Sequence, residues 1–313
     1  MTNTSDAIVH IIGGGPAGLM AAEAARASGI GVELHERMGS VGRKLLVAGK
    51  GGLNLTHSDA NDRFVEHFGS RRAAVAEWLE GFDAQALREW ARGLGIETFV
   101  GSSGRVFPMD LKAAPLLRRW VHRLRESGVK FHVRRRWTGW TADGALRFET
   151  DDGEIRVDAG ATILALGGGS WPVLGSDGAW VETLVSRAIG VAPLQAANCG
   201  FDVDWSAHLR DRFGGAPVKP VTITHAAADG DTVCKQGEFV ITRNGVEGSL
   251  IYAMSARLRD DIGERGPATI HLDLVPGRDM TRLARDLARP RGSRSRSEHL
   301  RRNAGIDGVK AAL

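Results

Sequence analysis

The segment Gly13 to Gly18, GGGPAG, constrains the fold of this chain more than any other part of its sequence. It follows the short apolar run AIVHII, which is typical of a buried parallel strand. It precedes an alanine-rich segment that ends at Gly29 and has the pattern of a helix. A strand, a glycine turn and a helix in this order predict the first βαβ unit of a dinucleotide-binding domain.

Each glycine of this G-x-G-x-x-G pattern has an expected role. Gly13 permits the tight turn, Gly15 lets a pyrophosphate approach the backbone, and Gly18 allows the helix to pack closely on the strand. The N-terminus of the helix offers unpaired N–H groups and the positive end of its dipole to phosphates. A second strand, GVELHE, ends at Glu36, where an acid is expected to accept hydrogen bonds from the adenosine ribose and to disfavour NADP. The pattern does not separate NAD from FAD, and a glycine turn without a nucleotide is the alternative interpretation.

A second glycine-rich segment, from Arg37 to Ser58, favours a large cofactor. Simple NAD dehydrogenases usually continue with alternating helix and strand here, whereas glycine-rich backbone can lie against a flat or charged group. The segment also carries side-chain donors suited to a phosphate-bearing cofactor, namely Arg43, Lys44, Lys50, Asn54, Thr56 and His57. A polar surface loop is the alternative.

Several segments together resemble the BaiN/YhiN-type family of FAD-dependent NAD(P) oxidoreductases. They are GGGPAGLMAA, GRKLLVAGKGGLNLTHS, SGRVFPM, ATILALGGGSWPVLGSDGAW and GEFVITRNGVEGSLIYAMS, and they extend over nearly the whole chain. The resemblance implies an α/β fold. Its parts are an FAD-binding, Rossmann-like domain of the two-dinucleotide-fold type with a β-meander, an inserted β-rich domain and a small helical piece.

The resemblance also implies which residues hold the cofactor FAD. The glycine turn, the end of the second strand, the loop after it and a later glycine cluster would contact FAD, and one residue would add backbone contacts to the adenine. These cofactor-binding candidates are Gly13, Gly15, Pro16, Ala17, Gly18, Glu36, Arg37, Gly42, Arg43, Lys44, Val133 (adenine), Gly167 and Gly168.

The activity implied by the resemblance is hydride transfer from NAD(P)H through the flavin to a small organic acceptor, such as an enone or an activated alkene. The cofactor would carry the chemistry while the protein orients it and supplies donors. The sequence does not assign a proton donor. The weak catalytic candidates near the flavin are Lys44, Lys50, Asn54 and His57.

Cysteine and histidine usage argues against two other chemistries. Cys199 and Cys234 lie outside the glycine-rich loop, so they predict no dithiol beside the flavin and are expected to be buried or inert thiols. The ten histidines show no metal-ligand spacing, since His122 and His132, for example, fall in separate predicted elements. The sequence therefore predicts no metal site.

Changes in sequence pattern predict three parts. Residues 1–192 are expected to form the FAD-binding Rossmann-like domain, residues 193–275 the inserted β-rich domain, and residues 276–313 an Arg-rich helical segment. In the first part, residues 71–92 and 113–127 carry helical patterns and residues 137–157 a meander. The expected N-cap is Asp83, and Trp78 and Trp90 are expected in the core.

No apolar run approaches the roughly 20 residues that span a bilayer, and the first residues lack the basic region of a signal peptide. A cytoplasmic protein without membrane contact is therefore the expectation.

The net charge of +4 is concentrated between Arg278 and Arg302, a segment with nine Arg and three acidic residues. Clustered Arg neutralises phosphates, so nucleic-acid contact is one interpretation, although the segment lacks interleaved aromatic residues and a solvated basic helix pair is favoured. In the resembling family the chain returns to the FAD domain after the helical piece, whereas this sequence stops at Leu313. An incomplete flavin site is therefore expected. The rival function is a non-catalytic nucleotide-binding or RNA-associated protein.

Overall fold

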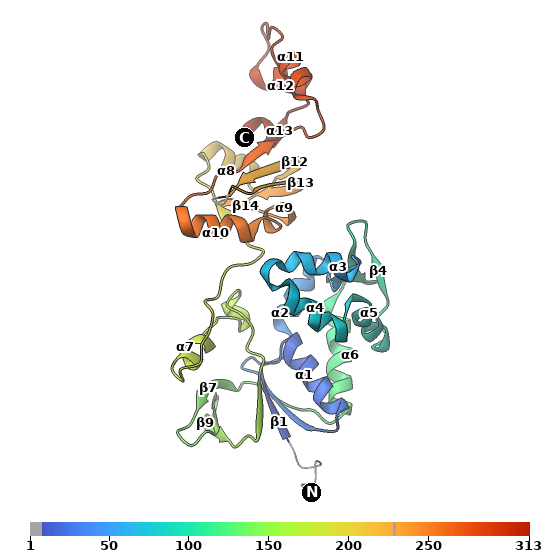
Figure 1. Cartoon of the computed structure of the whole chain (residues 1–313), viewed down its shortest axis with the longest axis vertical. Helices are drawn as coiled ribbons and strands as arrows, with labels where there is room; N and C mark the ends of the chain where they lie inside the picture. Colours follow the sequence, from blue (N-terminus) through green and yellow to red (C-terminus); the bar gives the residue numbers. More distant parts are fainter. Residues whose placement is uncertain (1–7, 228–229) are drawn as a thin grey trace. The chain divides into compact units, whose positions relative to one another are not determined.

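The computed structural model describes residues 8–227 and 230–313. The chain divides into two compact units, residues 1–194 and 195–313, and each is described by itself (Figure 1). Ala7, the first residue of the expected first strand, lies outside the described residues.

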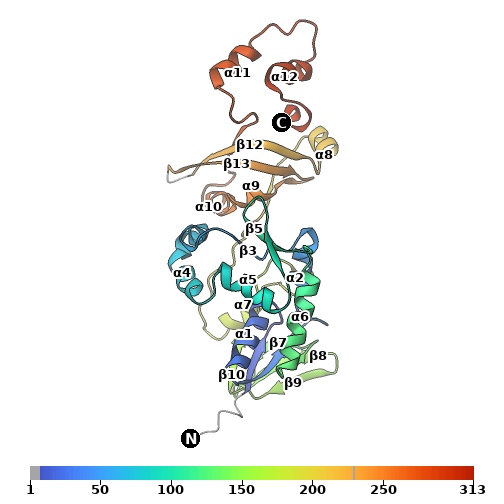
Figure 2. The ribbon, with the colours of Figure 1, turned by 90° about the vertical axis from the view of Figure 1, so that its right-hand side faces the viewer.

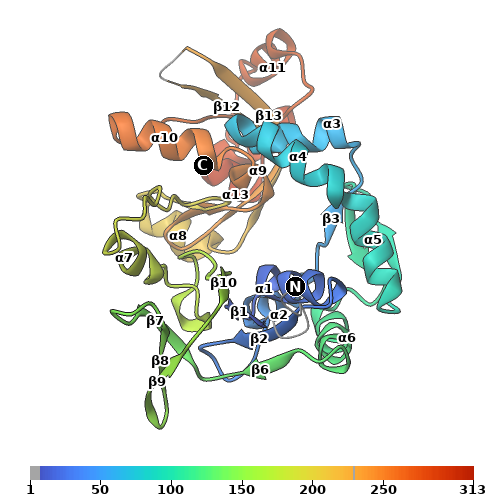
Figure 3. The same cartoon turned by 60° about the horizontal axis from the view of Figure 1, so that its bottom comes forward.

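The first unit is built on a parallel sheet of the type that the glycine pattern predicts. Its strands are β1 (Ile8–Ile12), β2 (Gly31–His35), β6 (Lys130–His132) and β10 (Ala161–Leu164), in the order β10-β1-β2-β6 (Figure 3). Helix α1 (Pro16–Ala27) connects β1 to β2. The Rossmann-like α/β fold is confirmed.

The two faces of this sheet have different covers because side chains alternate along a strand. On one face, Ile11 is fully buried and packs in a cluster with Leu19 of α1 and Leu124 of α6 (Ala113–Glu126). On the other face, Ile12 packs with Phe148 of the meander. The meander strands are β7 (Arg136–Trp140), β8 (Leu146–Thr150) and β9 (Gly153–Val157), antiparallel as the sequence predicts.

Between β2 and β6 the first unit adds helices and a small antiparallel sheet in the order β3-β5-β4. The elements are α2 (Arg43–Ala48), η2 (Gly49–Gly51), β3 (Thr56–His57), α3 (Asn61–Phe64), η3 (Val65–Arg71), α4 (Arg72–Gly81), α5 (Ala84–Gly93), β4 (Thr98–Val100) and β5 (Arg105–Pro108). After β10 follow η4 (Pro172–Leu174) and α7 (Trp180–Val185).

Helices α4 and α5 confirm the helical patterns of residues 71–92 and correct one expectation. Asp83 caps α5, since its carboxylate accepts a hydrogen bond from the backbone N–H of Ala86 at 2.8 Å. Trp90 is half-buried, and its ring meets Trp120 edge-on. The placement of Trp78 in the core is wrong, because this side chain is 70% exposed. The buried residue of α4 is Val75, three positions earlier, so the core-facing side of the helix is narrower than its sequence indicates.

The second unit contains an antiparallel sheet in the order β11-β14-β13-β12-β15, in which the long strands β12 and β13 lie side by side (Figure 2). Its core includes the fully buried Ile223, Phe239 and Ile251. Cys199 is half-buried and Cys234 is exposed, so burial does not account for Cys234 as an inert thiol. The elements are β11 (Phe201–Asp202), α8 (Ala207–Phe213), β12 (Pro217–Ala226), β13 (Thr232–Ile241), β14 (Gly245–Glu247), α9 (Ser249–Tyr252), α10 (Ser255–Arg265), β15 (His271–Asp273) and α13 (Gly308–Ala312).

The Arg-rich segment forms the expected helix pair, α11 (Met280–Leu287) and α12 (Arg296–Ala304). Acids inside the segment neutralise part of its charge, since Asp286 pairs with Arg278 and Arg289, and Glu298 pairs with two further arginines. No helix within the described ranges has both the length and the apolar character that crossing a membrane requires.

Candidate functional site

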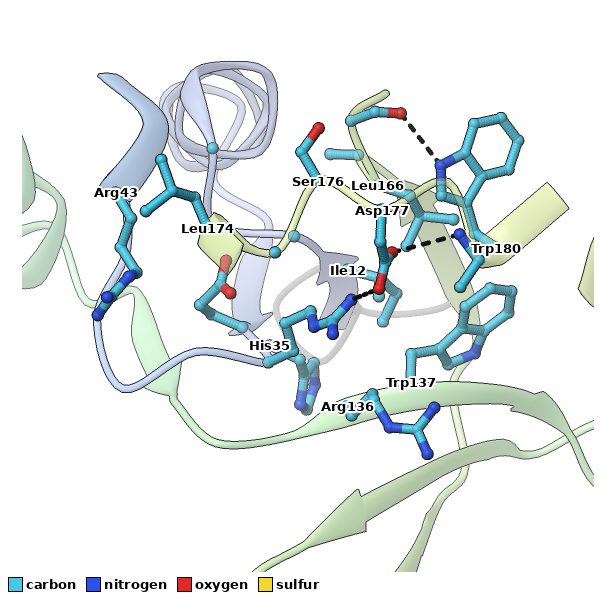
Figure 4. A pocket seen from close by; sticks show the side chains of 18 of the residues that line it. Ile12, His35, Arg43, Arg136, Trp137, Leu166, Leu174, Ser176, Asp177 and Trp180 are labelled. Atoms are coloured by element: carbon cyan, nitrogen blue, oxygen red, sulfur yellow. Dashed lines mark hydrogen bonds and ion pairs between the residues drawn. The ribbon is translucent and has the colours of Figure 1, made fainter. Parts of the chain in front are cut away.

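A pocket of about 480 Å³ opens at the carboxyl ends of the parallel strands, within the first unit (Figure 4). Its lining comes from the glycine turn after β1, the loop after β2, the start of the meander and the segment from β10 to α7. Strand β1 lies between β2 and β10. The chain passes from β1 to β2 on one side of β1, and β10 later pairs with β1 on the other side. This is the topological switch point at which open α/β sheets bind ligands. The volume lies within the usual range of small-molecule sites.

The glycine turn has the geometry that each glycine was expected to provide. Gly13 has φ +111°, and a Cβ there would overlap the backbone oxygen of Ala165 after β10. A Cβ on Gly18 would overlap the backbone oxygen of Gly13. No atom of the described residues lies within 4 Å of a Cβ on Gly15, which lines the pocket. Two glycines therefore serve close packing, and the third leaves backbone open to a ligand.

The N-terminus of α1 faces this opening with its first-turn amides uncapped by any described side chain. Gly15 is the N-cap in an extended conformation, Pro16 occupies the first turn, and that turn contains no acidic residue. The first N–H groups of a helix lack intrahelical partners and carry partial positive charge, so they bind anions. The end of α1 at the pocket is suited to a phosphate.

Glu36 occupies the predicted place at the end of β2, and its carboxylate is already engaged. One oxygen accepts from the backbone N–H of Gly14 at 2.8 Å, and the other accepts from the N–H of Met38 at 2.8 Å. The carboxylate thus fixes the glycine turn against the loop after β2. Each carboxylate oxygen has a further lone pair, so Glu36 can also accept from a ribose hydroxyl.

Cationic side chains from the loop after β2 and from the start of α2 line the same pocket. Arg37 forms an ion pair with Asp177 at 2.6 Å. The hydrogen bond from Arg37 holds the pKa of the Asp177 carboxyl below its usual value. Lys44 donates to the hydroxyls of Ser170 at 3.2 Å and Ser176 at 3.3 Å. Arg43 has a buried Nε without a hydrogen-bond partner in the described part of the chain. These cations provide charge and spare donors for an anionic ligand.

Two tryptophans form the opposite wall of the pocket (Figure 4). The indole N–H of Trp180 donates to the backbone oxygen of Gly167 at 3.1 Å. Trp137 is 8% exposed, and among the described residues its indole N–H has no hydrogen-bond partner. The wall is apolar, and Arg136 lies beside it. The sequence did not predict that Trp137, Trp180, Ser176 and Asp177 line the pocket. The meander and the segment GSDGAW, which contain them, were both recognised as motifs.

Most of the predicted cofactor residues line this one pocket, and a few do not. The lining includes Gly13, Gly15, Pro16, Ala17, Glu36, Arg37, Gly42, Arg43, Lys44 and Gly167. Gly18 packs beneath the turn, and the backbone oxygen of Gly168 accepts from Ser176 at 2.9 Å. Val133 lines a second groove of about 660 Å³ beside α6.

The weak catalytic candidates are dispersed. Lys44 lines the pocket, whereas Asn54 and His57 line neither the pocket nor the second groove. The imidazole of His57 pairs with Asp59 at 3.1 Å and contacts the backbone oxygen of Ser103 at 2.9 Å. The side chain of Lys50 lies outside the described part of the structure.

Comparison with known proteins gives a family match over most of the chain. Residues 7–271 match the family described as the HI0933-like protein Rossmann domain. Solved structures with a similar arrangement include a 3-ketosteroid-Δ4-(5α)-dehydrogenase from Rhodococcus jostii RHA1, in complex with 4-androstene-3,17-dione. It has 15% identity and a TM-score of 0.43, and the match covers 72% of this chain and 58% of that protein. The open conformation of a flavocytochrome c3 fumarate reductase has 17% identity and a TM-score of 0.45, with 68% and 47% covered. This chain thus spans about half the length of these two proteins, and similarities of this size carry no argument about its activity.

Proposed function

The chain belongs to the HI0933-like family of FAD-binding, Rossmann-type flavoproteins, and from that premise we propose that it transfers electrons from NAD(P)H to a small organic acceptor. The flavoprotein oxidoreductase character follows from the family. What we propose is the identity of the electron donor, NAD(P)H, and the class of the acceptor. An enone or an activated alkene is one example of such an acceptor.

The observation that carries the proposal is the meeting of an uncapped helix N-terminus, an open glycine and several cations in one pocket. Gly15 leaves room where a Cβ would project, and α1 presents its free amides beside it. Arg43 and Lys44 contribute positive charge from the start of α2. A dinucleotide carries two negatively charged phosphates, so its pyrophosphate matches this donor set. The residues present therefore fit FAD.

Different residues of the lining would hold different parts of FAD. The amides of α1, with Arg43 and Lys44, would hold the pyrophosphate, and Glu36 would accept from a ribose hydroxyl. Trp137 and Trp180 offer apolar surface to a ring system. When bound, FAD supplies the redox chemistry, because a flavin can accept and donate hydride.

Lys44 is the catalytic candidate that the geometry favours, because it alone among the four weak candidates is seen to line the pocket within the described part. Its ammonium is held by two serine hydroxyls and can donate a proton or stabilise negative charge. Because Lys44 also belongs to the proposed pyrophosphate set, its replacement is expected to weaken FAD binding as well as turnover.

The test is uptake of FAD by the purified full chain, followed by anaerobic addition of NADH or NADPH. We expect quenching of flavin fluorescence on binding and loss of the oxidised flavin absorbance when the reduced nicotinamide is added. Lys44→Ala is expected to weaken FAD binding about tenfold, the order of one charge-assisted hydrogen bond. The matched control is Lys235→Ala, an exposed lysine in the second unit.

Two results would contradict the proposal. A chain that neither retains nor takes up FAD would exclude the oxidoreductase function for this protein. A chain that binds FAD but leaves it oxidised under excess NADH and NADPH would exclude the nicotinamide donor and leave the flavoprotein intact.

A further inference from the structure

Three histidines and a glutamate gather on one face of the parallel sheet, although they are far apart in the sequence. His10 lies on β1 opposite Glu33 of β2, and His35 lies on β2 opposite His132 of β6. Residues opposite each other, and residues two apart on a strand, share a face. All four side chains therefore project toward the meander side of the sheet, where the ring of His35 stacks on Phe148 at 4.5 Å.

The ligand-capable atoms of this cluster are close to one another. Nδ1 of His10 lies 3.1 Å from Nε2 of His35, and one ligand atom from each of His10, Glu33 and His35 lies within 4.8 Å of the others. In a tetrahedral zinc site with bonds of about 2.0–2.1 Å, neighbouring ligand atoms are about 3.3 Å apart. The two facing nitrogens of His10 and His35 are already close to this separation. Rotation of the partly exposed Glu33 side chain can bring one of its carboxylate oxygens to the same distance.

The two histidines are buried. His10 is 5% exposed and His35 is fully buried. Burial lowers the pKa of His35 to about 3, with further lowering by His132 and His10, and burial also lowers the pKa of His10. Neutral imidazoles keep a lone pair for a metal ion. The ring of His35 contacts His10 through Nε2 and makes no other hydrogen bond in the described part. Its Nδ1 is buried without a partner there.

Glu33 is held in its ionised form by two neighbours. Burial opposes ionisation, but hydrogen bonds from Lys130 and His132 lower the pKa of Glu33 overall. His132 contacts one carboxylate oxygen at 3.0 Å, and Lys130 contacts the other at 3.3 Å. Metal-binding carboxylates commonly have such outer partners. Lys130 and Arg135 are the nearby cations that oppose a metal ion, and Lys130 is 68% exposed, so it can turn into solvent.

We propose that His10, Glu33 and His35 bind one divalent transition-metal cation of the Zn²⁺ class between β1 and β2, with His132 orienting the carboxylate. Two imidazole nitrogens and one carboxylate oxygen are ligands that Zn²⁺ takes in proteins, and a water completes four-coordination. Binding through both facing nitrogens requires the proton between the rings to move to the outer nitrogen of its ring, so both rings stay neutral. The ion would cross-link two neighbouring strands beside the dinucleotide pocket, whose lining includes His35.

The experiment is titration of the chelator-treated, flavin-free full chain with Co²⁺, whose visible absorbance reports coordination, followed by competition with Zn²⁺. We expect one Co²⁺ per chain with a four-coordinate spectrum, displaced by one Zn²⁺. His35→Leu keeps an apolar side chain against Phe148 and is expected to weaken Co²⁺ binding at least about 100-fold. His122→Gln changes an exposed histidine outside the cluster and should bind as the wild type does.

Two measurements on the wild type keep the proposal falsifiable where a variant does not fold. Zn²⁺ is expected to raise the unfolding temperature of the wild type, because a cation that binds the folded state stabilises it. A wild-type chain that takes up less than one Co²⁺ and shows no such shift would overturn the site. A cobalt spectrum that survives in His35→Leu would also overturn it and would leave a hydrogen bond as the role of the histidine pair. The metal ions alone are the probes, so failure of the flavin experiment does not affect this result.

Discussion

Acid should destabilise the first unit through His35. This imidazole is fully buried between its neighbours, and its pKa falls from an ordinary 6.5 to about 3 because burial, His132 and His10 all oppose its charge. In the unfolded chain the same group has its ordinary pKa. Below pH 6.5 the unfolded chain therefore binds a proton that the folded chain does not bind. Stability present above pH 6.5 is lost as the pH falls from 6.5 toward 3.

The size of this loss follows from the two pKa values. Each pH unit below the unfolded pKa costs about 1.4 kcal/mol for one proton, so a change from pH 7 to pH 5 costs about 2 kcal/mol of unfolding free energy. Urea unfolding followed by tryptophan fluorescence measures it, with a chelator present to exclude metal ions. Seven of the eight tryptophans lie before residue 195, so the fluorescence reports mainly on the first unit.

The matched variant for this prediction is His35→Leu, which cannot titrate. Its unfolding free energy should fall by about 2 kcal/mol less than that of the wild type over the same pH interval, since other titrating groups are common to both chains. His122→Gln, at an exposed position, should follow the wild type. Parallel pH profiles for the wild type and His35→Leu would refute the reasoning, because they would mean that His35 titrates alike in the folded and unfolded chains.

Four further substitutions test packing and the glycine turn. Gly18→Ala should destabilise the first unit by about 1–3 kcal/mol in urea unfolding, because its Cβ would overlap the oxygen of Gly13, whereas Gly15→Ala should fold normally and weaken FAD binding in a fluorescence titration. Equal effects of the two on folding would contradict these assignments. Trp78→Gln should change the unfolding free energy by less than about 0.5 kcal/mol, since the side chain is 70% exposed. Phe239→Ala should cost about 3–5 kcal/mol in the second unit and leave FAD binding to the first unit unchanged, as calorimetry and the same titration would show.

Local sequence signals predicted the fold well where neighbours along the chain decide the structure. The strand, turn and helix around Gly13 to Gly18 need only short-range rules, as does the cap at Asp83. Trp78 shows the limit, because an apolar residue at helical spacing is buried only when another element covers it. Nothing in the spacing of residues 71–92 says where that cover ends.

The parts of the site that sequence reasoning missed depend on strand register and on distant loops. His10, His35 and His132 have no metal-ligand spacing along the chain, yet the pairing of β1, β2 and β6 brings them to one face. The wall formed by Trp137 and Trp180 likewise needs the meander to fold beside the segment after β10. Register and long-range packing are tertiary properties, so a pattern read along one strand does not contain them.

Every described residue that lines the pocket at the glycine turn lies between positions 12 and 183, inside the first unit. Substitutions anywhere after residue 194 therefore leave each pocket-lining side chain unaltered. A directed-evolution library can therefore vary the second unit at random without replacing any described residue of this lining.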